Sequence, residues 1–239
     1  TGVAVLLTAV AIAGPAARIA AAASAGAATA TAAAERPADS AAAVLEGVDG
    51  IATGGNPATL VAWGDAEPLS VADDGRIFAA ASTLGRGRVI ALGHGGYLGH
   101  QGGDTPRFIA NAIAWLAPRS AAARPLRILG DPGEPAAAVL RAAGRELQIT
   151  PARRLAEADL ASFDIAILSP QAAHGAGRLE ELDRWLRQGG GLLAVETAWG
   201  QLQLGRAASV HELAANRLLQ DAGIAYTTAA ASPVRDGLY

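Results

Sequence analysis

Cysteine and methionine are absent from this sequence of 239 residues, and aromatic residues make up only 4% of it. Without cysteine there can be no disulfide bond, no thiolate metal site and no cysteine nucleophile. The core must be built mainly from alanine, leucine, valine and isoleucine, which is sufficient at this length. Because methionine is absent and the first residue is Thr1, we expect the sequence to be a fragment of a longer protein.

An excess of charge is also missing, since the formal net charge is −3. This balance gives no global electrostatic attraction to nucleic acid. The arginines occur in scattered pairs, such as Arg86 with Arg88 and Arg153 with Arg154, without the interleaved aromatic residues of a nucleic-acid-binding surface. We expect these side chains to be solvated, and we predict no nucleic-acid partner.

An apolar run, VAVLLTAVAIAG, extends from Val3 to Gly14. It is shorter than the ~20 residues that a membrane-spanning helix needs, and small residues with the A-x-A-like spacing of a signal cleavage site follow it. We expect residues 1–40 to be a signal-like segment with an alanine-rich linker, and the protein to be exported from a bacterium (secreted, periplasmic or at the cell surface). A buried core helix and an uncleaved anchor are the alternatives.

A small α/β block is predicted over residues 41–118. Residues 58–64 have the character of a strand, and residues 76–93 that of two strands joined by the turn LGRG, in which glycine supplies the positive φ of a hairpin. A helix is predicted over residues 104–117, because apolar residues recur there at helical spacing. Asp104 or Thr105 can cap this helix, with Pro106 in its first turn.

Residues 124–239 form the second predicted block, in which strands and helices alternate. The stretches PLRILG, RELQIT, ASFDIAILSP and GLLAVETAWG have strand character, and EPAAAVLRAAG and GRLEELDRWLRQGG have helical character. This alternation with short loops predicts an α/β fold with a mainly parallel sheet and helices on both faces. Ala121–Ala123 resembles a linker, so we expect two units, although the sequence leaves open whether the two blocks share one sheet.

The order of four segments resembles the N-terminal region of the TRP channel-associated factor family. These segments are RIFAAASTLGRGRVIALGHGGYL, DTPRFIANAIAWL, LEELDRWLRQGGGLLAVETAWGQLQL and ANRLLQDAGIAYT, and the resemblance extends from residue 45 to residue 227. The same stretch of the sequence is also similar to the region that precedes the catalytic domain of enhancin-like and mucin-degrading gluzincin metallopeptidases. The resemblance implies a flavodoxin-like, class I glutamine amidotransferase-like domain over residues 124–239, which we expect to be truncated.

Neither enzyme class to which the resemblance points is complete in this sequence. A class I amidotransferase needs a cysteine on a strand-to-helix turn, and neither a cysteine nor a G-x-S-x-G motif is present. The peptidase motif H-E-x-x-H is reduced to HELAA, in which Ala215 stands where a zinc site requires the second histidine. We therefore interpret His211 and Glu212 as the start of a surface helix.

The glycine-rich stretch GHGGYLGHQGGD, from Gly93 to Asp104, follows a predicted strand and holds two of the four histidines. His94, His100 and Asp104 could supply metal ligands, but their spacing does not place them on one helical face, and we predict no metal. Because open α/β sheets bind ligands beyond the carboxyl ends of strands, His94, Tyr97 and Asp104 are candidate ligand-binding residues. In the alternative interpretation His94 is a hydrogen-bonded, partly buried residue of a loop.

Glu196 and Trp199 follow the last of these strands and are the other candidate ligand-binding residues. An exposed tryptophan beside a carboxylate can stack on a sugar ring and bind its hydroxyls. In the alternative interpretation, which we favour, Trp199 packs against the following segment and Glu196 caps a turn.

Together these observations favour a non-catalytic, glutamine amidotransferase-like accessory or binding module of an exported protein. The resemblance implies as partners a glycan or glycoprotein, a cell-surface protein and a downstream peptidase domain in the full-length chain, and we expect no cofactor. One alternative is the N-terminal fragment of an active zinc-dependent gluzincin peptidase whose catalytic domain lies downstream. The other is a hydrolase with its site at His94, Asp104 and Glu196.

Overall fold

The computed structural model describes residues 40–52, 54–72, 74–117, 124–232 and 238. The apolar run at Val3–Gly14, and the linker expected at Ala121–Ala123, lie outside the described residues. None of the helices in the described ranges has the length and apolar character that crossing a membrane requires.

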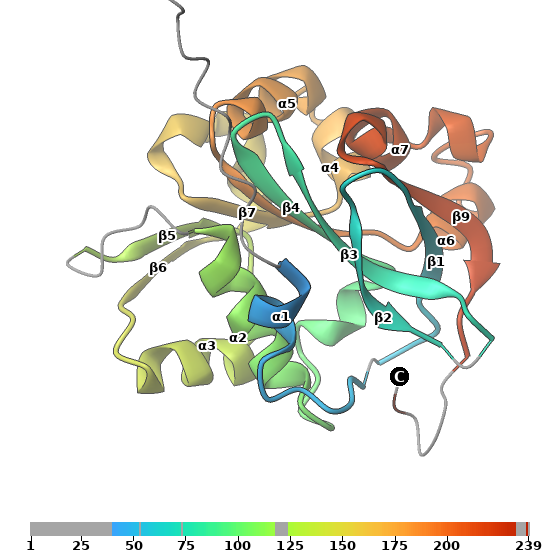
Figure 1. The fold of residues 1–239 in the computed structure, drawn as a ribbon. Helices are drawn as coiled ribbons and strands as arrows, with labels where there is room; N and C mark the ends of the chain where they lie inside the picture. Colours follow the sequence, from blue (N-terminus) through green and yellow to red (C-terminus); the bar gives the residue numbers. More distant parts are fainter. Residues whose placement is uncertain (1–39, 53, 73, 118–123, 233–237, 239) are drawn as a thin grey trace, which may run out of the picture. The chain divides into compact units, whose positions relative to one another are not determined.

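Nine strands form one sheet, with helices packed on it (Figure 1). The strands are β1 (Ala58–Ala62), β2 (Glu67–Val71), β3 (Ile77–Leu84), β4 (Gly87–Leu92), β5 (Leu126–Leu129), β6 (Leu147–Thr150), β7 (Ile165–Leu168), β8 (Gly191–Val195) and β9 (Ile224–Ala230). The α-helices are α1 (Ser40–Leu45), α2 (Thr105–Leu116), α3 (Glu134–Ala142), α4 (Pro170–Gly175), α5 (Leu179–Arg187), α6 (Ala198–Gln203) and α7 (Ala214–Leu219). Short 3-10 helices are η1 (Gly95–Tyr97), η2 (Ala152–Glu157), η3 (Leu160–Ser162), η4 (Val210–Glu212) and η5 (Gln220–Ala222).

The sheet is mixed, which corrects the expectation of a mainly parallel one. Its strand order is β6-β5-β7-β8-β4-β3-β1-β9, with β2 paired to β3. Neighbours from β6 to β4 run parallel, whereas the pairings of β4, β1 and β2 with β3, and of β1 with β9, are antiparallel. The β3–β4 hairpin is the reason, because it brings the antiparallel strands of the first block onto the edge of the parallel ones.

Strands of both predicted blocks therefore belong to the same sheet. The strands β5, β6, β7 and β8 of the second block lie together in the order β6-β5-β7-β8 at one end of the sheet. The fifth parallel position, however, is filled by β4 from the first block, and β9 lies at the far edge beside β1. Val89, Ile90, Ala91 and Leu92 of β4 are fully buried, as a central strand covered on both faces requires.

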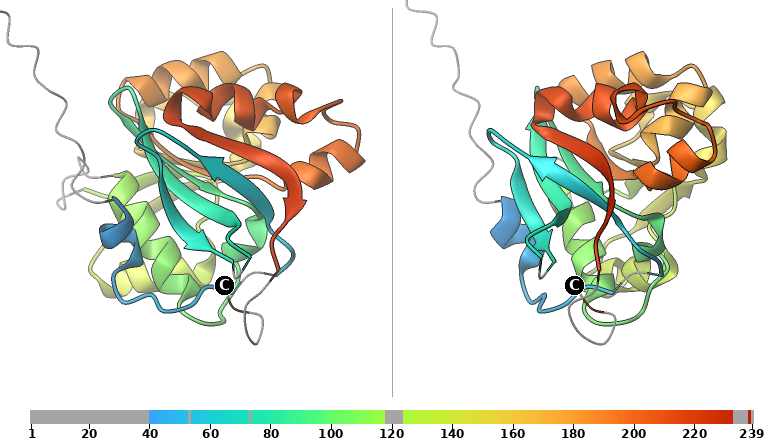
Figure 2. Two further views of the ribbon diagram at one scale, coloured as in Figure 1. Left: turned by 45° about the vertical axis from the view of Figure 1, so that its right-hand side comes forward. Right: turned by 90° about the vertical axis from the view of Figure 1, so that its right-hand side faces the viewer.

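Two apolar clusters cover the two faces of the sheet. Leu182 and Leu186 of α5 pack with Leu218 and Leu219 of α7 in one cluster. Phe108 and Ile113 of α2, Val44 of α1 and Leu140 of α3 belong to the other. In Figures 1 and 2, α5 and α7 accordingly lie on one side of the sheet and α1, α2 and α3 on the other.

The predicted elements of the hairpin and of the first long helix are confirmed. Leu84 pairs with Gly87 across the turn, and Gly85 has the expected positive φ of +62°. The helix α2 spans Thr105–Leu116, with Asp104 at its N-cap and Pro106 in its first turn.

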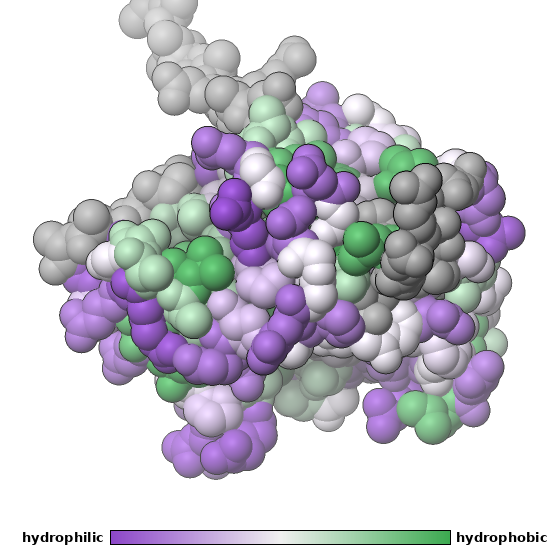
Figure 3. Space-filling model, turned by 90° about the horizontal axis from the view of Figure 1, so that it is seen from below, coloured by the Kyte–Doolittle hydropathy of each residue, from purple (hydrophilic) through white to green (hydrophobic). Residues whose placement is uncertain are grey.

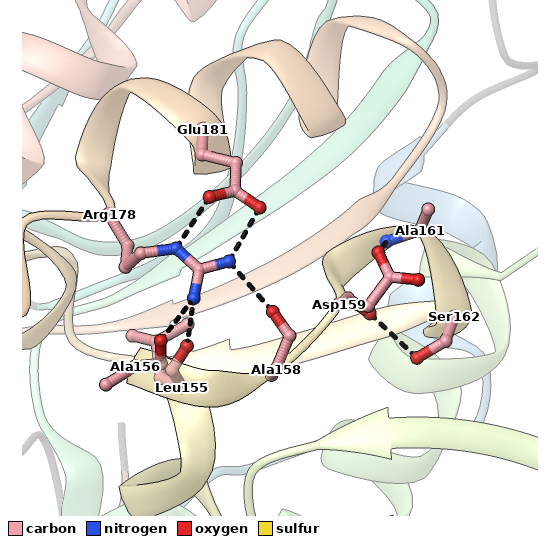
Figure 4. Close-up of polar contacts among 8 residues, drawn as sticks. All are labelled: Leu155, Ala156, Ala158, Asp159, Ala161, Ser162, Arg178 and Glu181. Carbon is pink, nitrogen blue, oxygen red and sulfur yellow. Dashed lines mark hydrogen bonds and ion pairs between the residues drawn. The ribbon is translucent and has the colours of Figure 1, made fainter.

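Arg178 ties the β6–β7 connection to the start of α5 (Figure 4). Its guanidinium forms a two-point hydrogen bond with the Glu181 carboxylate, with both distances 2.6 Å. The remaining N–H groups donate to the carbonyl oxygens of Leu155, Ala156 and Ala158, which lie 2.7–2.8 Å away. One side chain thus binds three carbonyl groups at the end of η2, of which that of Leu155 also accepts the Ala158 N–H at 3.3 Å.

Candidate functional site at the carboxyl edge of the parallel strands

Three parallel strands bring candidate residues to the same edge of the sheet. The strands β4, β7 and β8 are neighbours, and they are followed by His94, Ser169 and Glu196 respectively. The Glu196 N–H donates to the Leu92 carbonyl oxygen at 3.1 Å, so the ends of β4 and β8 are in direct contact. Ligands of open α/β sheets bind at this edge.

Glu196 is a buried carboxylate, with only 1% of its surface exposed. The Ser169 hydroxyl donates to its Oε2 at 2.6 Å, and the Gln201 side-chain amide donates to its Oε1 at 2.6 Å. A third contact comes from the Gln171 backbone N–H at 3.4 Å. These donors offset the cost of burying a polar group, and they leave no exposed carboxylate surface for a ligand.

Ser169 occupies the turn between β7 and α4, the position at which hydrolases of related architecture carry a nucleophile. Its backbone angles are φ −77° and ψ 126°, an ordinary extended conformation rather than a strained one. Its Oγ accepts the N–H groups of Gln171 and Ala172 while it donates to Glu196. The hydroxyl is therefore used as a helix cap and as a donor to a buried carboxylate.

Sequence reasoning missed Ser169. The signal was present as Ser-Pro directly after a buried strand, which is the pattern of a cap followed by proline in the first helical turn. The pairing with Glu196 had no such signal, because the two residues are 27 positions apart.

Trp199 lies on α6, half-buried, and packs against the cluster that contains α5 and α7. Its indole Nε1 is enclosed and has no hydrogen-bond partner within the described ranges. A sugar stacked on Trp199 would not reach the Glu196 carboxylate, which the Ser169 and Gln201 side chains cover. Glu196 and Trp199 are close in the sequence, but the structure does not bring them together in an open ligand site.

Tyr226, on β9, lies behind the same edge. Its hydroxyl donates to the carbonyl oxygens of Leu92 and Ala194, each 3.2 Å away. Burial, together with the nearby Glu196 charge, raises the pKa of Tyr226 well above its usual value. The phenol is therefore a neutral donor that links the ends of β4 and β8.

The loop from Gly93 to Asp104 is held by its own side chains. Nδ1 of His94 accepts the Gly96 N–H at 2.7 Å, and Nδ1 of His100 accepts the Gly102 N–H at 2.9 Å. Accepting requires an unprotonated Nδ1 in both rings. Burial of the half-buried His94 lowers its pKa, which favours the neutral form in which the ring can accept.

The other two candidates of this loop have structural contacts. Tyr97 is 1% exposed, and its ring stacks on that of Phe78 with the centroids 6.5 Å apart, so it is a core residue. The Asp104 carboxylate accepts the Asp49 N–H at 2.9 Å. The described residues contain no group of three histidine, aspartate or glutamate side chains that could hold a metal ion.

The surface helix expected at HELAA is a short 3-10 helix that is separate from the following α-helix. His211 and Glu212 lie in the 3-10 helix η4, both exposed, and α7 begins only at Ala214. Glu212 accepts the Ala208 N–H at 3.3 Å, and Ala215 is buried in the core. Leu213 separates the two elements because its extended ψ of 124° cannot continue a helix.

The chain is similar to known proteins both in sequence and in fold. The family model described as "TRPM8, N-terminal domain" (TCAF N-terminal domain) matches residues 27–236. TRPM8 channel-associated factor 2 from Bos taurus is 30% identical over 209 residues, covering 81% of this chain and 20% of that protein. The human factor 2 is 36% identical over 112 residues, covering 46% of this chain and 12% of its own length.

The structure of IMPa from Pseudomonas aeruginosa in complex with an O-glycopeptide has a similar fold, with a TM-score of 0.54. It is 17% identical in sequence, and the match covers 78% of this chain and 21% of that one. A second structure of the IMPa metallopeptidase gives a TM-score of 0.52 at 18% identity. The chain thus spans about a fifth of the first relatives it matches, in sequence and in structure.

Proposed function

Because the chain belongs to the TCAF N-terminal domain family, we propose that it is a non-catalytic binding module of a larger protein, and that it binds a cell-surface glycoprotein. The relatives by sequence are named as channel-associated factors, and the structural relative is a metallopeptidase crystallised with an O-glycopeptide. The first name describes a protein associated with a membrane channel, and the second describes a protein bound to a glycopeptide. The class I amidotransferase-like character then describes only a scaffold.

The proposal that the module is non-catalytic rests on the hydrogen bonds made by Ser169 and Glu196. A hydrolase needs a nucleophile whose hydroxyl meets a general base and a substrate. Here the Ser169 proton is directed at a carboxylate that is 1% exposed, and its lone pairs accept N–H groups of α4. The geometry supports a closed, structural hydrogen-bond network at the position where an active site would lie.

The surface on one side of the molecule also fits a module that binds through limited contacts. Seen from below, the described residues present a mixture of hydrophilic and intermediate side chains, with hydrophobic atoms in separate spots (Figure 3). Where the described residues are visible in this view, they form no extended apolar patch of the kind typical of permanent interfaces.

The runner-up is a part of a zinc-dependent gluzincin peptidase with its catalytic domain elsewhere in a longer chain. The likeness to IMPa, with a TM-score of 0.54, favours it. In that case this module would position the glycoprotein for the peptidase. The hydrolase centred on His94 and Glu196 is the weaker alternative, since Glu196 is buried and His94 uses Nδ1 for the Gly96 N–H.

Export remains part of the proposal. It is supported by the apolar run Val3–Gly14, and it would be tested by expressing the chain with its own N-terminal segment and measuring its appearance outside the cytoplasm. Retention of the whole protein in the cytoplasm would contradict it. The bacterial source stays a prediction, since the relatives by sequence named above are mammalian.

The experiment for the binding function uses the 239-residue chain and an immobilised mucin-type glycoprotein. We expect the chain to be retained on the glycoprotein and not on the bare matrix, while mass spectrometry shows the glycoprotein intact. Equal retention on the bare matrix would overturn the proposal. Cleavage that is lost in His94→Ala or Ser169→Ala would overturn it in favour of a hydrolase.

A further inference from the structure

The strand β6 leaves one side of its backbone without a partner among the described residues. It pairs with β5 and lies at one end of the sheet, with β9 at the other end (Figure 1). The Thr150 carbonyl oxygen accepts the Gly130 N–H of the β5 side at 2.8 Å. Because the backbone groups of successive residues point to opposite sides of a strand, those of Leu147 and Ile149 point away from β5.

The other two strands that have a single neighbour, β9 and β2, are protected against further pairing. At Tyr226 of β9, the Asn216 side-chain amide accepts the backbone N–H at 2.7 Å and donates to the carbonyl oxygen at 3.0 Å, as a neighbouring strand would. The strand β2 contains Pro68, which has no N–H to donate. Within the described ranges, no side chain binds the outer backbone groups of Leu147 or Ile149 in this way.

The side chains of β6 also suit a second strand. Leu147 is half-buried against the cluster that contains α2 and α3, and Ile149, on the same face of the strand, is 38% exposed. Gln148 lies on the opposite face and is exposed. Edge strands that avoid pairing usually carry charged side chains or proline, whereas these three residues are uncharged and each has an N–H.

Two copies of β6 can satisfy each other in one antiparallel register. If Gln148 lies opposite Gln148 of a second copy, then Leu147 lies opposite Ile149 of that copy, and Ile149 opposite its Leu147. These become the hydrogen-bonded pairs of the ladder, so every outer N–H and carbonyl group of the two residues gains a partner. The leucine and isoleucine side chains of the two copies then lie next to each other on one face.

The two neighbouring registers are less favourable. A pair centred on Leu147 would need the Arg145 N–H, which already donates to a carbonyl oxygen of α3 at 3.0 Å. A pair centred on Ile149 would need an N–H from Pro151, and it would bring Arg145 toward Arg153 of the second copy. Neither obstacle applies to the first register.

We propose that two copies of this chain associate through β6, with the strands antiparallel about a two-fold axis at Gln148. Such a pairing is closed, because it uses the open edges of both copies. The ends of the joined sheet are then the two β9 strands, where Asn216 already occupies the Tyr226 backbone. The product is therefore a dimer and not a growing filament, and it goes beyond the proposed function because it concerns the association of the module with itself.

The helix α3 is compatible with this arrangement. It connects β5 to β6, and it lies on the same side of the sheet as Leu147. With strands ~4.8 Å apart, two such helices above the joined edges would be about 10 Å apart, which is close to the ordinary distance between packed helices. Apart from Glu134 and Arg141, the exposed side chains of α3 are small or apolar, namely Ala138, Val139 and Ala142.

The first test is sedimentation equilibrium of the 239-residue chain at concentrations from about 5 to about 500 µM, because a short interface is expected to have a Kd of about 10–100 µM. We expect the average mass to rise toward twice that of one chain, and the rise to follow mass action. The mass of a single chain throughout this range would overturn the proposal.

Opposite charges placed on the axis test the register. In Gln148→Lys and in Gln148→Glu, like charges would face each other across the axis, so each variant should associate about three- to tenfold more weakly than the unmodified chain. An equimolar mixture of the two variants should associate within about twofold of the unmodified chain, because opposite charges then face each other. Gln203→Lys is the matched control, since Gln203 is exposed on α6, and it should associate normally.

Crosslinking gives an independent measurement. The chain has no cysteine, so Gln148→Cys would carry its only thiol. A non-hydrogen-bonded antiparallel pair brings two such side chains close enough for a disulfide bond, and we expect oxidised glutathione to convert this variant into a covalent dimer. Gln203→Cys should crosslink much more slowly at the same concentration.

Thermal unfolding shows whether each variant is folded, which is expected because the Gln148 side chain is exposed. Full association of a folded Gln148→Lys, or a mixture that associates no better than its components, would show that β6 is not the interface. Equal crosslinking of the two cysteine variants would contradict the proposal in the same way, even if a charge variant failed to fold.

Discussion

The Ser169 hydroxyl lies 2.6 Å from the buried Glu196 carboxylate, and this contact joins the ends of two neighbouring parallel strands. Among the described residues no cationic side chain pairs with this carboxylate, and its burial depends on neutral donors from Ser169, Gln201 and the Gln171 backbone. A polar group of this kind is favourable only while every donor is in place. The edge of the sheet that binds ligands in many α/β proteins is used here to hold the fold together.

Replacing Glu196 with alanine should therefore lower the free energy of unfolding by about 1–3 kcal/mol, because Ser169 and Gln201 would lose their acceptor in a buried place. Urea unfolding measures the change. Glu157→Ala is the control, since Glu157 is 70% exposed in a surface ion pair with Arg154 and should change the value by less than about 1 kcal/mol. Equal effects of the two substitutions would contradict the structural role of Glu196.

Arg178→Lys should destabilise the fold although the charge is kept. Lysine has three donors instead of five and cannot form the two-point contact with Glu181 together with the three carbonyl bonds. We expect a loss of about 1–3 kcal/mol in the free energy of unfolding. Arg141→Lys, at an exposed ion pair with Glu134, should be nearly neutral. An equal loss of stability in Arg141→Lys would contradict the role assigned to the Arg178 contacts.

Asp164 should make the stability depend on acid pH. Burial opposes ionisation of this carboxyl, but hydrogen bonds from the Arg124 side chain and the Arg127 N–H outweigh it and lower the pKa of Asp164. Its contribution is thus fully present above the unfolded pKa of about 3.9 and is lost as the pH falls through the folded pKa. Unfolding between pH 5 and pH 2 should show a smaller loss in Asp164→Asn than in the unmodified chain.

His94 should also make the stability of the fold decrease as the pH falls, but in a higher pH range than Asp164. Burial lowers the pKa of His94 below the unfolded value of about 6.5. Below that value the unfolded chain binds a proton that the folded chain does not, so stability is complete above about pH 6.5 and falls as the pH decreases toward the folded pKa. Thermal unfolding between pH 8 and pH 5 measures this loss.

His94→Asn supplies the comparison, because an asparagine oxygen can accept the N–H two residues later without titrating. The pH dependence should be reduced in this variant and unchanged in His211→Asn, since His211 is exposed. An unaltered profile in His94→Asn would show that protonation of His94 is not the source of the pH dependence.

The sequence was sufficient for elements whose signals are local. Helical spacing predicts α2, the glycine at position 85 predicts the hairpin, and apolar runs predict β5, β7 and β8. The strands β2 and β9 were not predicted, because β2 contains Pro68 and β9 is rich in alanine and threonine without a clean alternation.

Strand neighbours could not be predicted from local signals. The pairing of Arg88 with Gly191, which places β4 beside β8, joins residues far apart in the chain and leaves no periodic trace in either segment. The same limit applies to Tyr97, a ligand candidate by its place in a glycine-rich loop. The loop folds back on β3, and the ring becomes part of the core.

The adjacency of β1 and β9 has a consequence for biosynthesis. Ala62 pairs with Ile224 and Ala58 with Ala230, so the earliest strand is completed by the latest one. During translation, β1 must therefore keep one open backbone edge until β9 has left the ribosome. A stalled or shortened nascent chain would expose that edge, and chaperone capture would then decide between rescue and aggregation.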